Sequence, residues 1–325
     1  MGMRIKLSLF RRSIRWSLGV IFLAFFLFQV YVFIPVIHSP VDGYETRKGL
    51  VKSANVTRSW MEGDSDYHEI DLISTSGLKV EITVRIPSGN TTALPVAILL
   101  GGVGTGRDGC RIIPRIKNAI CVSLSYPYYG KKHLDTLGFL KNIRAIQQTV
   151  MDTPPAMMLT LDYVLSQPYS DTQQVELLGV SFGSYFVSIP AVYNQKVTRI
   201  WMAHGAAEPH KSMGHNYARD SKFKFLSNII AYWAGYAIGA QYVDPEKWVG
   251  RVSPRPVIMI NAENDKTFPH SSVAALHNAA KQPKEIIWTK GVHIAPSRTE
   301  VVEQLTNIVL SRIEGDYLKR LSNHR

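Results

Sequence analysis

The pentapeptide Gly179-Val-Ser-Phe-Gly183 constrains the fold of this chain more than any other part of the sequence. A short apolar run, 175–178, precedes it, and a helical pattern, 182–193, follows it. A G-x-S-x-G sequence between a strand and a helix is typical of a sharp turn that raises the serine on a strained backbone. Glycines on either side remove side chains that would clash there. The pattern alone is weak, but its strand and helix neighbours make Ser181 a candidate nucleophile.

The rest of the body alternates between short apolar runs and helical patterns. The runs suit buried parallel strands and cover 95–100, 119–125, 175–178, 197–203, 257–261 and 285–289. The helical patterns cover 146–165, 182–193, 271–280 and 299–318, and Pro190 predicts that the second of these is short or kinked. An antiparallel pair, 67–74 and 78–86, joined at Ser76-Gly77, precedes them. This order predicts an α/β fold with a doubly wound, mostly parallel sheet.

A nucleophilic serine needs a base that takes its proton and a third group that orients the base. His293 is the candidate base, because it follows the strand 285–289 and precedes the last helix. His204 also ends a strand and is the competing histidine. Asp265 is the candidate acid beyond the strand 257–261, with Glu263 close enough to compete. The order serine, aspartate, histidine is one of three known for such triads.

An oxyanion formed at the serine needs preorganised hydrogen-bond donors. The backbone N–H of Phe182, directly after the serine, is one candidate. Gly102 and Val103, in a glycine-rich loop after the strand 95–100, are candidates for the second. Such a loop can also cradle a phosphate, but neither GxxxxGK[ST] nor a complete GxGxxG is present. Nucleotide binding is therefore disfavoured.

Gly179-Val-Ser-Phe-Gly183, Asn264-Asp265 with Phe268-Pro269, and Gly291-Val-His293 resemble the α/β-hydrolase superfamily. The run Leu161-Asp-Tyr-Val-Leu-Ser-Gln-Pro168 is similar to that of dienelactone-hydrolase and prolyl-oligopeptidase-like serine esterases. The resemblance covers about residues 66–318. It implies hydrolysis of an ester, thioester or amide through an acyl-enzyme without a metal or cofactor. The usual His-Gly beside the oxyanion loop is replaced by Gly101-Gly102, so the resemblance does not identify the second donor.

The segment 16–37 contains no charged residue. As a helix it would be about 33 Å long, which matches a hydrocarbon core of about 30 Å. It is longer than the apolar region of a cleavable signal peptide, and no small-x-small cleavage motif follows it. Five basic residues precede it: Arg4, Lys6, Arg11, Arg12 and Arg15. By the positive-inside rule we expect a cytoplasmic N-terminus and a periplasmic or otherwise extracytoplasmic catalytic domain.

These features predict four parts: a basic cytoplasmic tail (1–15), a transmembrane anchor (16–38), a linker (39–65) and an α/β-hydrolase domain (66–325). Within the last part, residues 206–252 form an insertion that is rich in aromatic residues. One interpretation is an ordinary packed helix pair. The other is a helical cap that supplies an apolar wall of an acyl-binding pocket.

The composition excludes several classes of protein. Hydrophobic residues make up 46% and charged residues 19% of the chain, which is a globular balance. The net charge of +12 comes without an Arg/Lys stripe or an RNA-binding motif, so nucleic-acid binding is disfavoured and attraction to anionic lipid headgroups is favoured. Cys110 and Cys121 are compatible with a disulfide in an exported protein or with two small core residues.

The leading hypothesis is a membrane-anchored serine hydrolase that cleaves a small-molecule or lipid ester. A peptidase, thioesterase or acyltransferase would use the same acyl-enzyme chemistry. The rival from another class is a non-catalytic binding module that has kept the fold.

Overall fold

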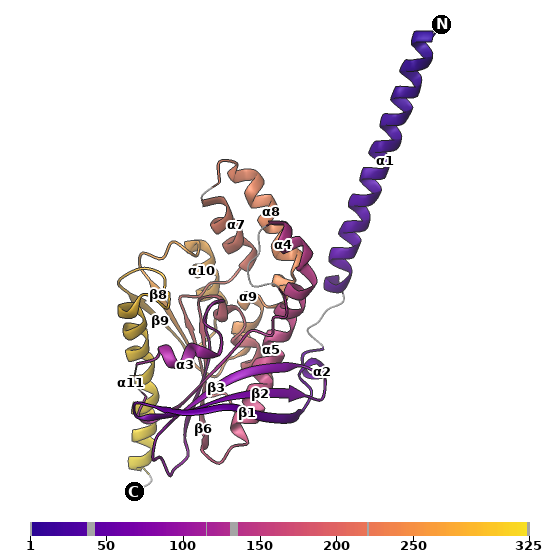
Figure 1. Cartoon of the computed structure of the whole chain (residues 1–325). Helices are drawn as coiled ribbons and strands as arrows, with labels where there is room; N and C mark the ends of the chain where they lie inside the picture. Colours follow the sequence, from indigo (N-terminus) through magenta and orange to yellow (C-terminus); the bar gives the residue numbers. More distant parts are fainter. Residues whose placement is uncertain (1, 38–42, 115, 131–135, 220, 324–325) are drawn as a thin grey trace.

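Nine strands form one mixed sheet in the computed structural model, which describes residues 2–37, 43–114, 116–130, 136–219 and 221–323 (Figure 1). The strand order is β1-β2-β3-β5-β4-β6-β7-β8-β9. The strands are β1 (Val51–Glu62), β2 (Ser65–Ser74), β3 (Lys79–Pro87), β4 (Leu94–Leu100), β5 (Ile120–Leu124), β6 (Ser170–Val180), β7 (Arg199–Ala203), β8 (Val257–Ala262) and β9 (Lys284–Thr289). The first three are antiparallel, and β3 pairs antiparallel with β5. The strands β5, β4, β6, β7, β8 and β9 run parallel to one another.

Helices cover both faces of the sheet and create two hydrophobic cores. The α-helices are α1 (Gly2–Ile37), α2 (Tyr44–Lys48), α3 (Gly109–Ile112), α4 (Thr136–Lys141), α5 (Ile143–Leu165), α6 (Ser188–Tyr193), α7 (Pro209–Arg219), α8 (Lys224–Ala237), α9 (Pro245–Trp248), α10 (His270–Ala279) and α11 (Thr299–Asn323). One core lies against α5, α6, α9 and α10, and the other against α3 and α11. Every residue of β4 is buried, as expected for a strand covered on both faces. The predicted α/β fold with a mostly parallel sheet is confirmed.

The linker predicted over 39–65 differs from the structure. Residues 44–48 form α2, and residues 51–62 form β1, which pairs antiparallel with β2. Most of β1 is exposed, because it is the edge strand of the sheet. A strand that buries neither face lacks the apolar alternation by which strands are found in a sequence. Residues 38–42 lie outside the described part of the chain.

The helix predicted over 182–193 is divided into two pieces. A 3₁₀ helix, η3, covers Ser181–Tyr185, and α6 covers Ser188–Tyr193. The division falls at residues 186–187, so Pro190 lies in the first turn of α6, where its missing N–H leaves no intrahelical bond unmade. The last helix continues to Asn323, beyond the predicted end at 318.

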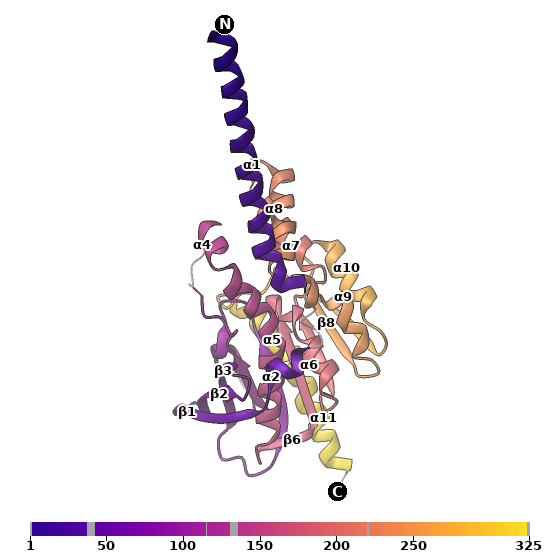
Figure 2. The same ribbon diagram turned by 90° about the vertical axis from the view of Figure 1, so that its right-hand side faces the viewer.

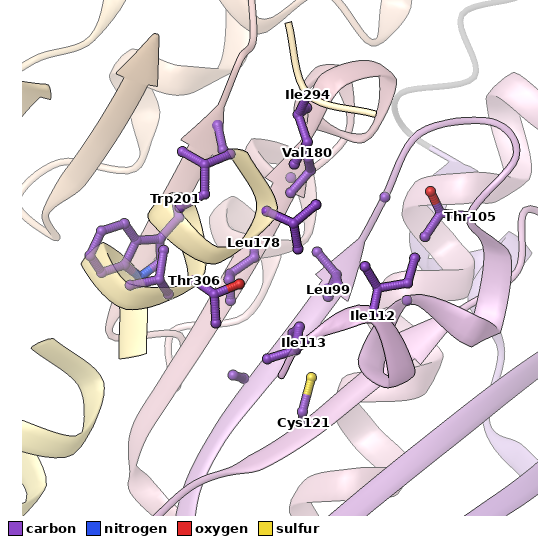
Figure 3. Close-up of a pocket in the computed structure, with 18 of the residues that line it drawn as sticks. Leu99, Thr105, Ile112, Ile113, Cys121, Leu178, Val180, Trp201, Ile294 and Thr306 are labelled. Carbon is purple, nitrogen blue, oxygen red and sulfur yellow. The ribbon is translucent and has the colours of Figure 1, made fainter. Parts of the chain in front are cut away.

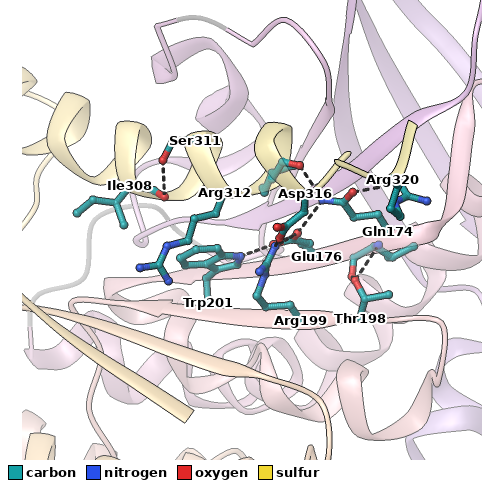
Figure 4. A network of polar contacts seen from close by, with 12 residues as sticks. Gln174, Glu176, Thr198, Arg199, Trp201, Ile308, Ser311, Arg312, Asp316 and Arg320 are labelled. Atoms are coloured by element: carbon teal, nitrogen blue, oxygen red, sulfur yellow. Dashed lines mark hydrogen bonds and ion pairs between the residues drawn. The ribbon is translucent and has the colours of Figure 1, made fainter. Parts of the chain in front are cut away.

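A buried carboxylate joins α11 to the sheet (Figure 4). Glu176 on β6 has no exposed surface and accepts hydrogen bonds from Arg199 Nε at 2.9 Å and from the Trp201 indole. Arg199 also lies 2.9 Å from Asp316 of α11. The charges of Glu176 and Arg199 compensate each other within the core. The guanidinium of Arg199 links β6 and β7 to α11.

Both cysteines lie in the same core as free thiols. Burial raises the pKa of Cys110 to about 11 and that of Cys121 well above its usual range. The core-residue interpretation of Cys110 and Cys121 therefore describes this structure.

Among the described residues, one helix is long and apolar enough to cross a membrane, over Arg15–Pro35, and only 6% of its most apolar window is buried. This part of α1 projects away from the body (Figure 1). Its C-terminal end packs on the body, where Val32 is fully buried and its carbonyl accepts a hydrogen bond from Gln147. The insertion after β7 forms the helix pair α7 and α8, followed by α9.

Candidate active site

The turn after β6 holds Ser181 in a backbone conformation that few residues adopt. Its φ is 54°, in the left-handed region. A Cβ atom at Gly183 would lie 2.0 Å from the carbonyl oxygen of Leu100, and one at Gly179 would lie 2.7 Å from Ser184 Cα. Both contacts are with backbone atoms, which cannot move aside cheaply. The two glycines are therefore required for the turn that presents Ser181.

Three predicted residues lie in hydrogen-bond contact. Ser181 Oγ is 2.7 Å from His293 Nε2, and His293 Nδ1 is 2.7 Å from Asp265 Oδ2. The carboxylate accepts from Nδ1–H, which leaves the Nε2 lone pair free to accept from the serine hydroxyl. The side chains of His293 and Asp265 are 13% and 10% exposed. The arrangement can move the serine proton to a base whose tautomer is held by the acid.

Adjacent parallel strands bring the acid and the base together. Asp265 follows β8 and His293 follows β9, and these strands are neighbours whose carboxyl ends meet at one edge of the sheet. Two backbone hydrogen bonds tie their loops: Glu263 N donates to Thr289 O, and Asn264 N donates to Gly291 O, each at 3.0 Å. Gly291 has a φ of 116°, which a side chain would disfavour.

The carboxylate of Asp265 is held in its charged form. Burial raises the pKa of this group, but the hydrogen bond and charge of His293 and the N–H of Thr267 outweigh burial, so that the pKa is lowered. Thr267 N donates to Oδ1 at 2.7 Å, so both carboxylate oxygens are engaged. The competing acid, Glu263, is exposed, whereas Asp265 contacts His293.

The competing base, His204, lies beside the relay in a different position. It is 1% exposed, and its ring centroid is 5.6 Å from that of His293. Its Nδ1 accepts the N–H of Ile294, the residue after His293, at 2.9 Å. Burial lowers the pKa of His204 to about 4, so the ring is neutral at pH 7. Its position at the end of β7 indicated a site residue, but the sequence did not indicate this backbone contact.

His204, Asp265 and His293 place nitrogen and oxygen atoms within 4.8 Å of one another, a spacing that could hold a metal ion. All three side chains already form hydrogen bonds. His293 bonds through both nitrogens, Asp265 through both oxygens and His204 through Nδ1. A metal would have to displace the serine or the carboxylate from the relay, so the cluster is better described as a hydrogen-bonded unit.

Two of the predicted oxyanion-hole residues, Gly102 and Phe182, lie near the serine. A Cβ atom built at Gly102 would be 4.0 Å from Ser181 Cβ. Two hydrogen bonds hold the loop after β4: Thr105 N donates to Gly102 O at 3.0 Å, and Tyr126 Oη donates to Gly101 O at 2.6 Å. Val103 follows and is 72% exposed. Phe182 follows Ser181, and its ring packs against Tyr126 and Phe186.

Two cavities meet at Ser181. The inner cavity, of about 140 Å³, extends between the sheet, α3 and α11 (Figure 3). The second cavity, of about 470 Å³, lies under α7 and is called the insertion-side cavity below. Its wall includes Phe182 and Phe268, and also the polar side chains of Ser212 and Asn216. Ser181 therefore lies between two separate spaces.

No family model and no curated protein matches the sequence. Solved structures do match. The acetyl xylan esterase of Paenibacillus sp. R4 is 15% identical, with a TM-score of 0.61 over 82% of this chain and 92% of its own. Acetyl xylan esterase 1 of a Thermoanaerobacterium species is 13% identical, with a TM-score of 0.59 over the same shares. A cold-adapted esterase from an Arctic intertidal metagenomic library is 11% identical, with a TM-score of 0.52 over 78% and 98%. The chain therefore has the α/β-hydrolase fold that these esterases share.

Proposed function

We propose that this chain is a membrane-anchored serine hydrolase that cleaves a carboxylic ester through an acyl-enzyme on Ser181. The observation that carries the proposal is the relay in which His293 lies 2.7 Å from both Ser181 Oγ and Asp265 Oδ2. The fold and the esterase neighbours support it.

In the first half of the reaction, Ser181 Oγ attacks the ester carbonyl carbon while His293 Nε2 takes the hydroxyl proton. The charge that develops on the carbonyl oxygen would be stabilised by backbone N–H groups of Phe182 and of Gly102 or Val103. The bond to the alcohol oxygen then breaks, and His293 returns the proton to that oxygen. Asp265 stabilises the imidazolium between the two transfers.

In the second half, a water molecule loses a proton to His293 and attacks the acyl carbon. The bond to Ser181 Oγ breaks, His293 returns the proton to Oγ, and the carboxylic acid leaves. No cofactor is needed for either step, because the serine supplies the nucleophile and the histidine carries the proton.

Labelling with a fluorophosphonate tests whether the chain is an enzyme. The parent protein should be labelled, and a Ser181→Ala variant should not be. Ser271→Ala is the matched control, because Ser271 is exposed on α10, outside the relay, and should leave labelling unchanged. A parent protein that takes up no label would favour a non-catalytic binding module instead.

A panel of esters, thioesters and peptides with matched acyl groups tests the reaction class. Turnover should be fastest with the ester. A faster reaction with the thioester or the peptide would assign the chain to those alternatives, and acyl transfer to an added alcohol in preference to water would assign an acyltransferase.

The helix α1 supports anchoring. Its apolar span of 21 residues is long enough to cross a bilayer, and only 6% of the most apolar window within it is buried. With the basic residues before it, the N-terminus would be cytoplasmic and the hydrolase domain extracytoplasmic. Protease treatment of intact spheroplasts should digest the domain, and the mature protein should retain residues 1–38. Removal of those residues would instead identify a cleaved signal sequence.

A further inference from the structure

The inner cavity is apolar along nearly its whole wall. The sheet contributes Leu99, Leu178 and Trp201, whose side chains point into it, and Ile112 and Thr306 approach from the two helices (Figure 3). Ser181 and Gly102, which follow the carboxyl ends of β6 and β4, also line it. The cavity therefore leads from the candidate nucleophile into the hydrophobic core.

The hollow exists because little chain covers this part of the sheet. The α-helix that follows β4, α3, contains only four residues. Small side chains, Ala97 on β4 and Cys121 on β5, lie beneath the gap. The long helix α11 closes the far side through Leu310 and Ile313. A closely packed core leaves few voids larger than a water molecule, so a space of about 140 Å³ beside a nucleophile is unusual.

We propose that the inner cavity binds the acyl chain of the substrate, and that the substrate is an ester of a medium-chain fatty acid. An apolar cavity of about 150 Å³ stays dry and accepts a benzene molecule, so this one holds an acyl chain of about six carbons. The inference rests on the proposed function, since the chain enters as Ser181 becomes acylated.

The insertion-side cavity then receives the alcohol. It is larger, about 470 Å³ against about 140 Å³, so it can hold a bulkier group, and Ser212 and Asn216 stand in a wall that is otherwise mostly apolar. The acyl chain must stay bound until water attacks, whereas the alcohol must leave first. The smaller space fits the first requirement, and the larger space fits the second.

The test compares p-nitrophenyl acetate, hexanoate and dodecanoate as substrates. For the parent protein, kcat/KM should be highest for hexanoate, by about tenfold or more, because each buried methylene contributes to binding of the transition state. Thr306→Phe should fill the cavity from α11 and lower the ratio of kcat/KM for hexanoate to kcat/KM for acetate by a similar factor. Gln304→Phe is the matched control, since Gln304 is exposed on the same helix. Ile112→Phe fills the cavity from the opposite wall, and it replaces Thr306→Phe in the same assay if that variant does not fold.

A binding measurement separates this inference from the proposed function. Trp201 lines the cavity, so 6-bromohexanoate bound there should quench tryptophan fluorescence in a Ser181→Ala protein. Adding Thr306→Phe should abolish the quenching. Binding without hydrolysis of any ester by the parent would retain the cavity assignment and refute the esterase. Ester hydrolysis with the same chain-length profile in the parent and in both filled variants would overturn the cavity assignment and leave the esterase intact.

The outer face of α8 carries large apolar side chains that are exposed. Leu226, Ile229 and Ile230 are 54%, 50% and 44% exposed, and Phe225 is 80% exposed. These residues lie three or four positions apart along the helix and continue to Trp233, so they form one apolar stripe. Soluble surfaces seldom carry such a continuous apolar patch.

The stripe continues onto α1. The Trp233 ring stacks on Phe28 with centroids 6.1 Å apart, and its Nε1 donates to Gln29 Oε1 at 2.9 Å. Both views place the C-terminal end of α8 near the C-terminal end of α1 (Figures 1 and 2). Lys222 and Lys224 flank the start of the stripe, where they can meet anionic headgroups. The apolar surfaces of α1 and α8 are therefore continuous, and the medium that surrounds α1 also contacts the stripe of α8.

We infer that the bilayer lipid that surrounds α1 also covers the apolar stripe of α8, which rests on the proposed anchoring. Nitroxide labels on cysteines introduced into the full chain, in phosphatidylcholine and phosphatidylglycerol vesicles, test this. A label in place of Ile229 should be more accessible to oxygen than to a water-soluble nickel chelate, and a label in place of exposed Glu303 should show the reverse. A label in place of Leu23 reports on the anchor. A lipid environment at Leu23 with a water environment at Ile229 overturns this inference alone, and water at both positions overturns the anchoring as well.

Discussion

At Gly183 the backbone passes so close to β4 that a methyl group would lie 2.0 Å from the carbonyl oxygen of Leu100. We expect Gly183→Ala to lower the free energy of unfolding by more than about 2 kcal/mol and to abolish fluorophosphonate labelling. Gly104→Ala is the control, because a Cβ atom there meets nothing within 4 Å. Thermal unfolding and labelling of the two variants check the prediction, and equal melting temperatures would contradict it.

The relay allows a second prediction at this scale. His293→Ala should lower kcat/KM for ester hydrolysis by several orders of magnitude, and Asp265→Asn by about 10⁴, because the amide favours the wrong imidazole tautomer. Glu263→Gln should retain the parent rate, since Glu263 is exposed and Asp265 contacts the base. Steady-state kinetics on one soluble ester are sufficient, and parent-level turnover by His293→Ala would reject the assignment.

Because His204 is buried, we expect the stability of the folded protein to depend on pH. Burial lowers its pKa from 6.5 to about 4, so the folded state disfavours the proton. Neutral His204 therefore contributes about 3 kcal/mol to the free energy of unfolding. This contribution is fully present above pH 6.5 and is lost as the pH falls toward about 4. His204→Asn should keep an acceptor for Ile294 N–H, tolerates the φ of 49°, and removes the ionisation. Denaturant unfolding at pH 7, 6 and 5 should show a shallower loss for the variant, and identical slopes would refute the prediction.

At the scale of elements, the attachment of α11 to the sheet depends on a buried ion pair. Glu176 has no exposed surface, so Glu176→Ala leaves Arg199 without its main partner and should lower the free energy of unfolding by about 3 to 5 kcal/mol. Glu285 and Arg312 form an exposed pair between β9 and the same helix. Because this pair is exposed, Glu285→Ala should lower the free energy of unfolding by about 1 kcal/mol or less. Chemical denaturation compares the two, and a larger effect for Glu285→Ala would refute this ranking.

At the scale of the whole molecule, the relay lies entirely within the body, from Ser181 to His293. A chain that begins at Tyr44 should therefore be released from membranes by alkaline carbonate, because only the stripe of α8 would still contact lipid, and it should hydrolyse p-nitrophenyl acetate within about threefold of the parent rate. The contact of Val32 with Gln147 would be lost, which predicts a small decrease in melting temperature. Cell fractionation and an ester assay check this, and an inactive, folded truncated protein would show that α1 shapes the site.

Local patterns in the sequence predicted the fold class and the candidate relay. The glycines around Ser181 and the strand ends before Asp265 and His293 are local features, and the meeting of these residues follows from the shared edge of parallel strands. The strand β1 was not predicted, because an exposed edge strand buries neither face and leaves no apolar alternation.

The sequence by itself determined where each strand ends and which chemical groups stand at those ends, because side-chain periodicity and turn chemistry act over a few residues. Only the tertiary structure decided that His293 meets Ser181 and that His204 binds the backbone N–H of Ile294. It also decided that a short α3 leaves an apolar hollow beside α11. These properties arise from contacts between residues far apart in the chain, and the packing of the whole molecule sets the distances between them.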